Sequence, residues 1–269
     1  MSKTILLTGA TDGIGLEAAR MLISLGHNVL LHGRNPAKLE NVKETLSTLP
    51  DGGQVESYVA DLSSMADVEV LSKAVAEKHA KLDVLINNAG VFKTASPITQ
   101  DGLDVRFVVN TIAPYLLTQQ LMPLIGAAGR IINVSSAAQS PVDPEALTGR
   151  VKLSDDFAAY AQSKLAITMW SRMMAQALGD EGPAIIAVNP GSLLNTKMVK
   201  EAFGATNNDI GIGAKILTRA ALSDEFGTAS GLYFDNDSGM FASPHADALD
   251  SQKPQEIVRV IETILAEQI

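Results

Sequence analysis

The architecture of this chain can be predicted from Thr8-Gly9-Ala10-Thr11-Asp12-Gly13-Ile14-Gly15, which lies close to its start. The apolar run Thr4–Leu7 precedes this segment, and helical periodicity over 14–25 follows it. Glycine adopts positive φ without strain and lets other groups approach the backbone closely. Between a strand and a helix, such a turn presents free N–H groups and the positive helix end to a phosphate. We therefore interpret the segment as a dinucleotide-binding turn, with a glycine-rich turn that holds no ligand as the alternative.

Short β-like runs alternate with amphipathic stretches along the rest of the chain, which is typical of βαβ units that build a parallel sheet. The predicted strands are Thr4–Leu7, Val29–His32, Val55–Val59, Val84–Ile86, Arg130–Val134, Ala184–Val188 and Leu232–Phe234. The predicted helices span 14–25, 36–49, 66–79, 101–121, 157–178 and 254–267. We expect one α/β domain with a doubly wound, Rossmann-like fold, in which helices cover both faces of a parallel sheet of about seven strands. Two stretches break the alternation and predict long loops, at 137–156 and 235–253.

Composition excludes several functions. The 269 residues carry a net charge of −9 and contain no run of Lys and Arg, so a nucleic-acid partner is not expected. The lack of cysteine excludes disulfides, thiolate nucleophiles and cysteine-ligated zinc, and the four histidines are scattered without metal-ligand spacing. We find no signal peptide and no apolar run of membrane-spanning length. We expect a cytoplasmic protein with no metal and no membrane partner.

The glycine spacing resembles the Thr-Gly-x-x-x-Gly-x-Gly turn of short-chain dehydrogenases/reductases of the classical type. Two further motifs fit that family, namely Asp61-Leu62 after the third predicted strand and Asn87-Asn88-Ala89-Gly90 after the fourth. In the family the first pair contacts adenine, and the second motif braces the sheet and passes close to the adenine ribose. The resemblance extends from Lys3 to about Phe234 and implies a nicotinamide cofactor. The contacts that it implies are Gly9, Thr11, Asp12, Gly13, Ile14, Gly15, Asp61, Leu62, Asn88, Ala89 and Gly90.

The second predicted strand ends in His32-Gly33-Arg34-Asn35. In NAD-preferring relatives an acidic residue stands about where Gly33 is and accepts a hydrogen bond from the ribose 2′-hydroxyl. Here a cation follows instead, and a guanidinium can bind a 2′-phosphate with two charge-assisted hydrogen bonds. We therefore expect NADP(H) rather than NAD(H), held by Arg34 and Asn35 with help from Lys38. The alternative is that Arg34 is a solvated loop cation.

Tyr160 and Lys164 lie one helical turn apart on the same face of the predicted helix 157–178. An adjacent ammonium favours the phenolate and lowers the tyrosine pKa from about 10, which suits a general acid or base. Ser136 follows the fifth strand, at the edge of the sheet where ligands bind, and can hydrogen-bond a carbonyl. Alignment with the family gives Ser136 the catalytic position, and Ser135 is the lesser candidate. In the family the lysine also holds the nicotinamide ribose, so Tyr160 and Lys164 would contact the cofactor too.

The resemblance implies roles for several more residues. Asn110 matches the family's asparagine that holds a water next to the lysine, although a buried helical asparagine without a catalytic role is the alternative. Pro190-Gly191 matches the turn that covers the nicotinamide, and Thr196 would contact its carboxamide or phosphate. The threonine comes one position later than usual, which leaves Ser192 or Asn195 as substitutes.

The segment between Ser136 and Tyr160 is longer than in the most compact members of the family. Together with the C-terminal layout, it resembles the branch of retinol dehydrogenases, WW-domain oxidoreductase and light-dependent protochlorophyllide reductase, which handle bulky lipophilic substrates. We expect an NADP(H)-dependent oxidoreductase that transfers hydride between nicotinamide and a carbonyl or alcohol carbon, and that reduces a lipophilic aldehyde, ketone or quinone. The alternatives are a catalytically silent NADP-binding redox sensor and an NAD-dependent alcohol dehydrogenase.

The segment from Tyr160 to Leu178 carries an apolar surface wider than one sheet-facing stripe requires. The residues on it are Leu165, Ile167, Met169, Trp170, Met173, Met174 and Leu178. A helix that is apolar on most sides is usually buried on most sides. We therefore expect a homodimer or homotetramer that uses this helix, unless the long loops cover it within a monomer.

Overall fold

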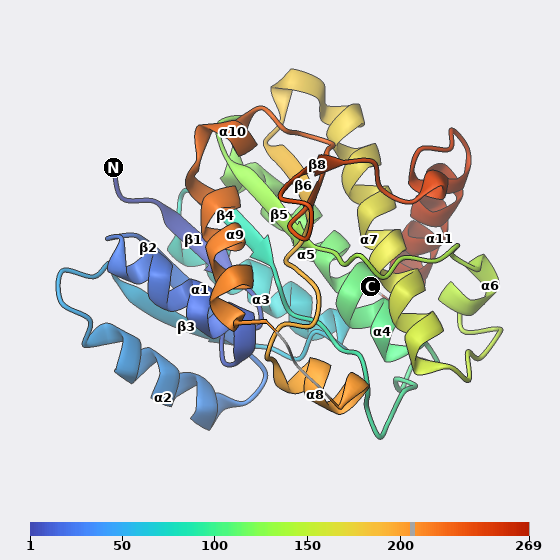
Figure 1. Ribbon diagram of the computed structural model, residues 1–269, viewed down its shortest axis with the longest axis horizontal. Coiled ribbons are helices and arrows are strands. Elements are labelled where there is room, and N and C mark those ends of the chain that lie inside the picture. Colours follow the sequence, from blue (N-terminus) through green and yellow to red (C-terminus); the bar gives the residue numbers. More distant parts are fainter. Residues whose placement is uncertain (205–207, 269) are drawn as a thin grey trace.

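The computed structural model describes residues 1–204 and 208–268 of the chain (Figure 1). One sheet forms its centre, with the strand order β3-β2-β1-β4-β5-β6-β7-β8. Adjacent strands from β3 to β7 are parallel, and β8 is antiparallel to β7. The strands are β1 (Thr4–Leu7), β2 (Asn28–Gly33), β3 (Val55–Val59), β4 (Val84–Asn87), β5 (Arg130–Val134), β6 (Ala184–Asn189), β7 (Tyr233–Asp235) and β8 (Met240–Ala242).

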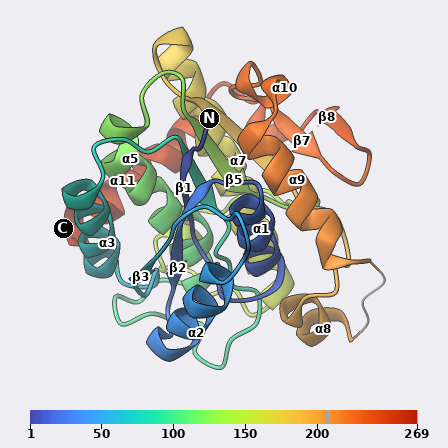
Figure 2. The ribbon, with the colours of Figure 1, turned by 90° about the vertical axis from the view of Figure 1, so that its left-hand side faces the viewer.

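Helices cover both faces of the sheet, as the sequence predicts. In Figure 2, α1 and α9 lie on one side of the sheet and α3, α5 and α11 on the other. The α-helices are α1 (Gly13–Ser24), α2 (Pro36–Ser47), α3 (Met65–Lys78), α4 (Val105–Phe107), α5 (Ala113–Ile125), α6 (Pro144–Leu147), α7 (Asp156–Leu178), α8 (Lys197–Phe203), α9 (Ile210–Leu222), α10 (Asp224–Gly227) and α11 (Lys253–Gln268). A π-helical turn, η1, spans Val108–Ile112, and two short 3₁₀ turns are η2 (Gly179–Glu181) and η3 (Ala246–Ala248).

The strands are continuous apolar runs because a hydrophobic core lies on each face of the sheet. Successive strand residues point to opposite faces, so Leu6 belongs to the core under α3, α5 and α7, whereas Ile5 and Leu7 belong to the core under α1 and α9. The strand order reverses between β1 and β4, whose neighbours on either side run outward in opposite directions. Such a switch point opens a crevice at the carboxyl ends of the strands, where ligands bind in open α/β sheets.

The structure corrects several predicted elements. The helix expected over 101–121 begins only at Val105 and contains the π-helical turn Val108–Ile112. Strand β8 and the turn η3 lie in the stretch expected to be a loop at 235–253, and α6 lies within 137–156. Helices α8, α9 and α10 were not predicted. Glycines near the start of α9 lower its helix propensity, but one of them, Gly213, leaves room for Leu194, and the helix packs closely on α1.

The broad apolar surface of α7 is covered by a helix of the same chain. Helix α11 packs against it, so Leu165, Ile167, Met169 and Trp170 are buried, while Met173, Met174 and Leu178 are partly buried against the same core. Helix α11 and the turn η3, which lies in the stretch expected to be a loop at 235–253, thus both cover α7 within one chain. The expected homo-oligomer stays a prediction. None of the helices in the described part of the chain is both long and apolar enough to cross a bilayer.

We predict that Gly15→Ala destabilises the protein, although alanine normally favours a helix. A Cβ at position 15 would lie 2.2 Å from the carbonyl oxygen of Gly9 and 2.5 Å from Nδ2 of Asn88, so the turn must shift. Overpacking of this kind costs about 1–3 kcal/mol, or a Tm lower by several degrees. The control is Gly211→Ala, whose Cβ would meet only the Asp209 carboxylate and should cost little. Thermal unfolding followed by circular dichroism measures both, and an unchanged Tm for Gly15→Ala would contradict this packing.

Candidate active site

A cavity of about 710 Å³ opens at the carboxyl ends of the central strands. Its volume lies within the range of about 300–1,000 Å³ that is usual for small-molecule sites. The residues predicted above to contact the cofactor or to act in catalysis line this cavity, with the exceptions of Asn110 and of Asn195, a possible substitute for Thr196. The fold thus brings the predicted residues together around one cavity, from segments that are up to 187 positions apart, from Gly9 to Thr196.

The glycine turn has the backbone that its sequence requires. Gly9 and Gly13 have φ values of 66° and 53°, in the left-handed region that favours glycine. Asn88 fixes the turn to the end of β4, because its Nδ2 donates to the carbonyl oxygens of Thr8 at 2.9 Å and Gly9 at 3.1 Å. The expected bracing role of this asparagine is thus visible as two hydrogen bonds.

Asp12 starts helix α1 and lies at the mouth of the cavity. Its carboxylate accepts from the backbone N–H of Gly13 at 2.8 Å and forms an ion pair with Lys38 at 2.7 Å. The hydrogen bond with Lys38 is the largest effect on the pKa of Asp12, which is lowered from its usual value despite some burial. Both groups are half exposed, so the pair contributes little to stability, but it places a cation beside the turn.

His32 supports the turn in a way that sequence reasoning did not find. The ring is buried, its Nδ1 accepts from the backbone N–H of Gly9 at 3.2 Å, and its Nε2 lies 3.1 Å from the carbonyl oxygen of Ala60. Burial lowers the pKa of His32 to about 4, so the ring is neutral near pH 7. Two such partners require the tautomer that carries its hydrogen on Nε2. No local motif marks this contact, because Gly9, His32 and Ala60 meet only after strand pairing.

The end of β2 carries the residues expected to choose the cofactor. Arg34 and Asn35 are exposed at the rim of the cavity. The Asn35 side chain accepts from the backbone N–H of Lys38 at 2.9 Å and caps helix α2, so part of its hydrogen-bonding capacity is already used. A Cβ at Gly33 would lie 2.5 Å from Cγ2 of Thr11. The position that is acidic in NAD-preferring relatives therefore has no room for a side chain unless Thr11 moves.

The catalytic candidates meet at the end of β5. Lys164 and Tyr160 project from α7, and Ser136 follows the strand, with its side chain hydrogen-bonded to Tyr160. The Lys164 amine donates to the carbonyl oxygen of Val134 at 2.7 Å and lies 5.6 Å from the centre of the Tyr160 ring. Ser135 instead turns into the protein, where its hydroxyl donates to the carbonyl oxygen of Lys164 at 3.0 Å. The structure thus favours Ser136 over Ser135 as the serine of the site.

Burial sets the protonation of this group. It raises the pKa of Tyr160, and the hydrogen bond from Ser136 opposes that effect only partly. Burial also lowers the pKa of Lys164 to about 8. The sequence-based expectation of a lowered tyrosine pKa is therefore wrong for the protein alone, because desolvation outweighs the charge of a lysine that is itself desolvated and bonded to Val134. Near pH 7 Tyr160 is a protonated acid.

Asn110 lies behind the cavity, in the π-helical turn η1. Its Oδ1 accepts from the backbone N–H of Val91 at 2.8 Å, and its Nδ2 donates to the Val91 carbonyl at 2.9 Å and to the Ser163 hydroxyl at 2.9 Å. The amide thus joins the segment after β4 to the helix that carries Tyr160. A Cβ at Gly90 would come within 3.5 Å of Oδ1 of Asn110 and 3.7 Å of the Lys164 amine. The expected water beside the lysine stays a prediction.

The segment after β6 closes the other side of the cavity. Pro190 and Gly191 line it as expected, and so do Ser192 and Thr196. Thr196 caps helix α8 by accepting from the backbone N–H of Val199 at 3.2 Å, and its methyl group faces Gly13. Thr196 therefore lies beside the glycine turn, which suits contact with a phosphate. Asn195 does not line the cavity.

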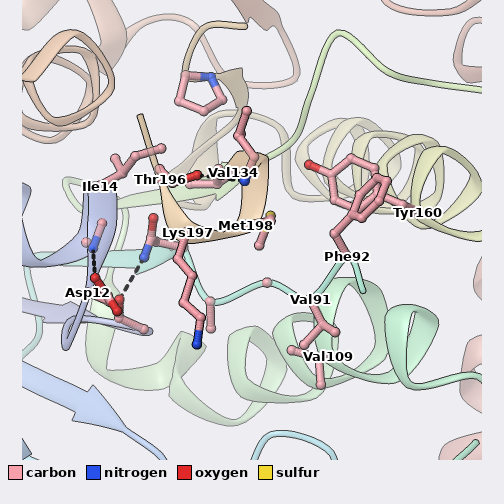
Figure 3. Close-up of a pocket in the computed structure, with 18 of the residues that line it drawn as sticks. Asp12, Ile14, Val91, Phe92, Val109, Val134, Tyr160, Thr196, Lys197 and Met198 are labelled. Atoms are coloured by element: carbon pink, nitrogen blue, oxygen red, sulfur yellow. Dashed lines mark hydrogen bonds between the residues drawn. The ribbon is translucent and has the colours of Figure 1, made fainter. Parts of the chain in front are cut away.

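An apolar wall lies next to the tyrosine (Figure 3). The ring centres of Phe92 and Tyr160 are 4.8 Å apart, and those of Phe92 and Phe157 are 6.4 Å apart. Figure 3 shows Tyr160 and Phe92 together on one side and Asp12 with Lys197 on the other. Further apolar lining residues are Val91, Val109 and Met198. The described residues contain no group of three or more His, Asp or Glu side chains placed to hold a metal ion.

Known proteins share both the sequence and the fold of this chain. A family model described as short chain dehydrogenase matches residues 3–207. Retinol dehydrogenase 13 of Mus musculus is 30% identical over 263 residues, which cover 91% of this chain and 79% of that protein. The long segment before Tyr160 and the C-terminal layout predicted a similarity to retinol dehydrogenases, and this match confirms it.

Solved structures agree with the sequence matches. A protein from Mycobacterium paratuberculosis superposes with a TM-score of 0.81 at 25% identity, over 97% of this chain and 92% of that chain. The angucycline C-6 ketoreductase LanV, solved with bound NADP, superposes with a TM-score of 0.68 at 27% identity, over 88% of this chain and 95% of that chain. The chain therefore belongs to the short-chain dehydrogenase family, as an oxidoreductase that acts on alcohol or carbonyl groups and resembles the retinol dehydrogenases.

Proposed function

We propose that this protein is an NADP(H)-dependent reductase of lipophilic aldehydes, ketones or quinones. The observation that carries the proposal is a protonated Tyr160, hydrogen-bonded to Ser136, that packs on Phe92 and lines the same cavity as the glycine turn. A phenol held beside a hydroxyl suits donation of a proton to a carbonyl oxygen. The apolar surroundings suit a substrate that prefers to leave water.

The residues of the cavity fit a nicotinamide dinucleotide. The glycine turn and the start of α1 would hold the pyrophosphate, since Gly9, Gly13 and Gly15 all line the cavity at the start of that helix. Asp61 and Leu62 line the part of the cavity where the adenine would lie, and Pro190 and Gly191 line the part expected for the nicotinamide. These placements rest on the family resemblance together with the shape of the cavity.

Three features support NADP(H) over NAD(H). Arg34 lies at the rim with Lys38 close in sequence, and both line the cavity. The crowding of Gly33 against Thr11 disfavours the acidic residue that an NAD site uses. Structural relatives such as LanV were solved with NADP. Similarity to proteins named retinol dehydrogenases and ketoreductases supports lipophilic carbonyl or alcohol substrates.

The chemistry follows from the placement of the side chains. When it is bound, the reduced nicotinamide supplies a hydride to the carbonyl carbon. Ser136 and Tyr160 would both hydrogen-bond the carbonyl oxygen, and Tyr160 would transfer its proton to that oxygen as negative charge develops there. Lys164 would leave the Val134 carbonyl to hold the ribose and would then supply positive charge near the tyrosine. Phe92 and the apolar wall would exclude water from this proton transfer.

Tyr160→Phe should lower turnover of a carbonyl substrate by roughly 10²–10⁴-fold, because it removes only the proton donor. NADPH affinity should remain close to that of the wild type, since the ring and its packing on Phe92 persist. Steady-state assays that follow NADPH absorbance measure the first effect, and fluorescence titration measures the second. Turnover within a few-fold of the wild type would rule out Tyr160 as the acid.

Arg34→Ala should weaken NADPH binding by roughly 10–150-fold, which corresponds to about 1.5–3 kcal/mol for charge-assisted hydrogen bonds. NADH binding should change little, because the 2′-phosphate is the chemical difference between the two cofactors. The control is Arg20→Ala, which removes an exposed arginine paired with Glu17 on α1 and outside the cavity. Equal losses for NADPH and NADH would mean that Arg34 supports the loop rather than the phosphate.

The cofactor-free protein should become more stable as the pH rises from about 8 toward 10.5, because Lys164 loses its proton more easily in the folded protein than in the unfolded chain. Its pKa in the folded protein is about 8, below the usual 10.5, so the unfolded chain binds more protons within this window. The free energy of unfolding should therefore gain up to about 1.4 kcal/mol for each pH unit from this group. Urea unfolding of the wild type and of Lys164→Met across these pH values isolates the effect. Identical pH dependence of the two proteins would contradict the lowered pKa.

A further inference from the structure

The C-terminal hairpin comprises β7, a turn at 236–239 and β8, and it is firmly attached to the sheet (Figure 2). Tyr233 of β7 pairs in register with Ala187 of β6. The Phe241 ring of β8 lies 5.1 Å from the rings of both Phe234 and Phe226. Strand pairing on one side and aromatic packing on the other therefore leave the hairpin little freedom to shift.

One side chain of this hairpin reaches the backbone of the catalytic serine. Tyr233 is 6% exposed, and its hydroxyl donates to the carbonyl oxygen of Ser136 at 3.1 Å. Nε2 of Gln139 donates to the same oxygen at 2.9 Å. Tyr233 does not line the cavity, so its hydroxyl is free of any direct part in the proposed chemistry.

The backbone at Ser136 needs such support because it lies just past the end of the sheet. The backbone N–H of Ser135 donates to Val188 of β6 at 2.8 Å, which extends the ladder one residue past β5. Ser136 then begins the long connection to α7. A rotation of its peptide would turn the hydroxyl away from Tyr160, and a misplacement of about 1 Å at a reacting group can cost about 10²-fold in rate.

The same hairpin also fixes the turn at 189–192 across the cavity. Asp237 accepts from the backbone N–H of Ser192 at 2.8 Å and from its hydroxyl at 2.6 Å. Nδ2 of Asn189 donates to Asp235 at 2.8 Å and to Asp237 at 2.9 Å. One rigid element thus holds both the strand end that carries the serine and the turn expected to face the nicotinamide.

We propose that Tyr233 is a positioning residue for carbonyl reduction, and that it holds Ser136 toward Tyr160 from a hairpin that also fixes the turn at 189–192. The inference rests on the proposed reductase function, because it needs Ser136 and Tyr160 to act on one substrate oxygen. Loss of the Tyr233 hydroxyl removes one of the two side-chain donors that hold the Ser136 carbonyl, without touching cofactor or substrate. The hydrogen bond from Ser136 lowers the pKa of Tyr160, so a displaced serine also raises that pKa.

The test compares Tyr233→Phe with Tyr115→Phe. Tyr115 is a matched control, because it is 3% exposed and its hydroxyl donates to Glu262 at 2.9 Å, away from the cavity. Tyr233→Phe should lower kcat by about 3- to 10-fold, the equivalent of one hydrogen bond, with an unchanged Kd for NADPH. In alcohol oxidation, the pH at which activity reaches half its maximum should rise. Tyr115→Phe should leave kcat and this pH unchanged at a comparable loss of Tm.

Equal kcat values for the two variants would overturn the proposal, and so would a loss of kcat without the shift in pH profile, since general loosening lowers kcat alone. Gln139→Leu removes the second donor to Ser136 and provides the same readouts if Tyr233→Phe folds poorly. Because both donors hold one carbonyl, their effects on kcat should not be additive in the double variant. Tyr160→Phe in the same assay separates the two proposals, because full activity in that variant would defeat the reductase mechanism itself.

Discussion

The close contact between the glycine turn and the end of β4 is the constraint on which the rest of the site depends. A Cβ at Gly9 would lie 2.8 Å from Cα of Ala89, so the two backbones touch directly. The Thr8 hydroxyl accepts from the backbone N–H groups of Asn88 and Ala89 at 3.0 and 3.1 Å, which locks the contact from the other side. This contact fixes the start of the segment after β4, in which Gly90 packs close to the side chains of Asn110 and Lys164. The cofactor turn and the catalytic helix are therefore parts of one packed unit.

Much of this arrangement could be predicted from the sequence, since local patterns specify strands, turns and the spacing of Tyr160 and Lys164. The parts that could not be predicted depend on contacts between distant segments. Helix α9 has a weak local signal because of its glycines, yet one of them, Gly213, allows close packing on Ile14 of α1. The role of His32 likewise depends on three strands that meet only in the folded protein. A strand of three residues such as β8 is too short to show the alternation of apolar and polar residues that predicts a strand.

The pKa values of Tyr160 and Lys164 could not be predicted from the spacing of these residues alone. Four residues of separation place a lysine beside a tyrosine, which suggests attraction between ammonium and phenolate. The same helix buries both groups, and desolvation penalises each charged form. Before any ligand binds, burial therefore favours the protonated form of Tyr160, whereas Lys164, with a pKa of about 8, is still mostly charged near pH 7.

The hydrogen bond between Tyr233 and Ser136 also bears on the order in which the protein is assembled during synthesis. It joins residues 97 positions apart, whereas the glycine turn and its partners on β4 all lie within the first 90 residues. Contacts between distant residues close larger loops and tend to form late. The first 90 residues therefore leave the ribosome well before the hairpin has been synthesised. The partners of the glycine turn are thus all present early in translation, whereas the hydrogen bond from Tyr233 to Ser136 can form only near its end.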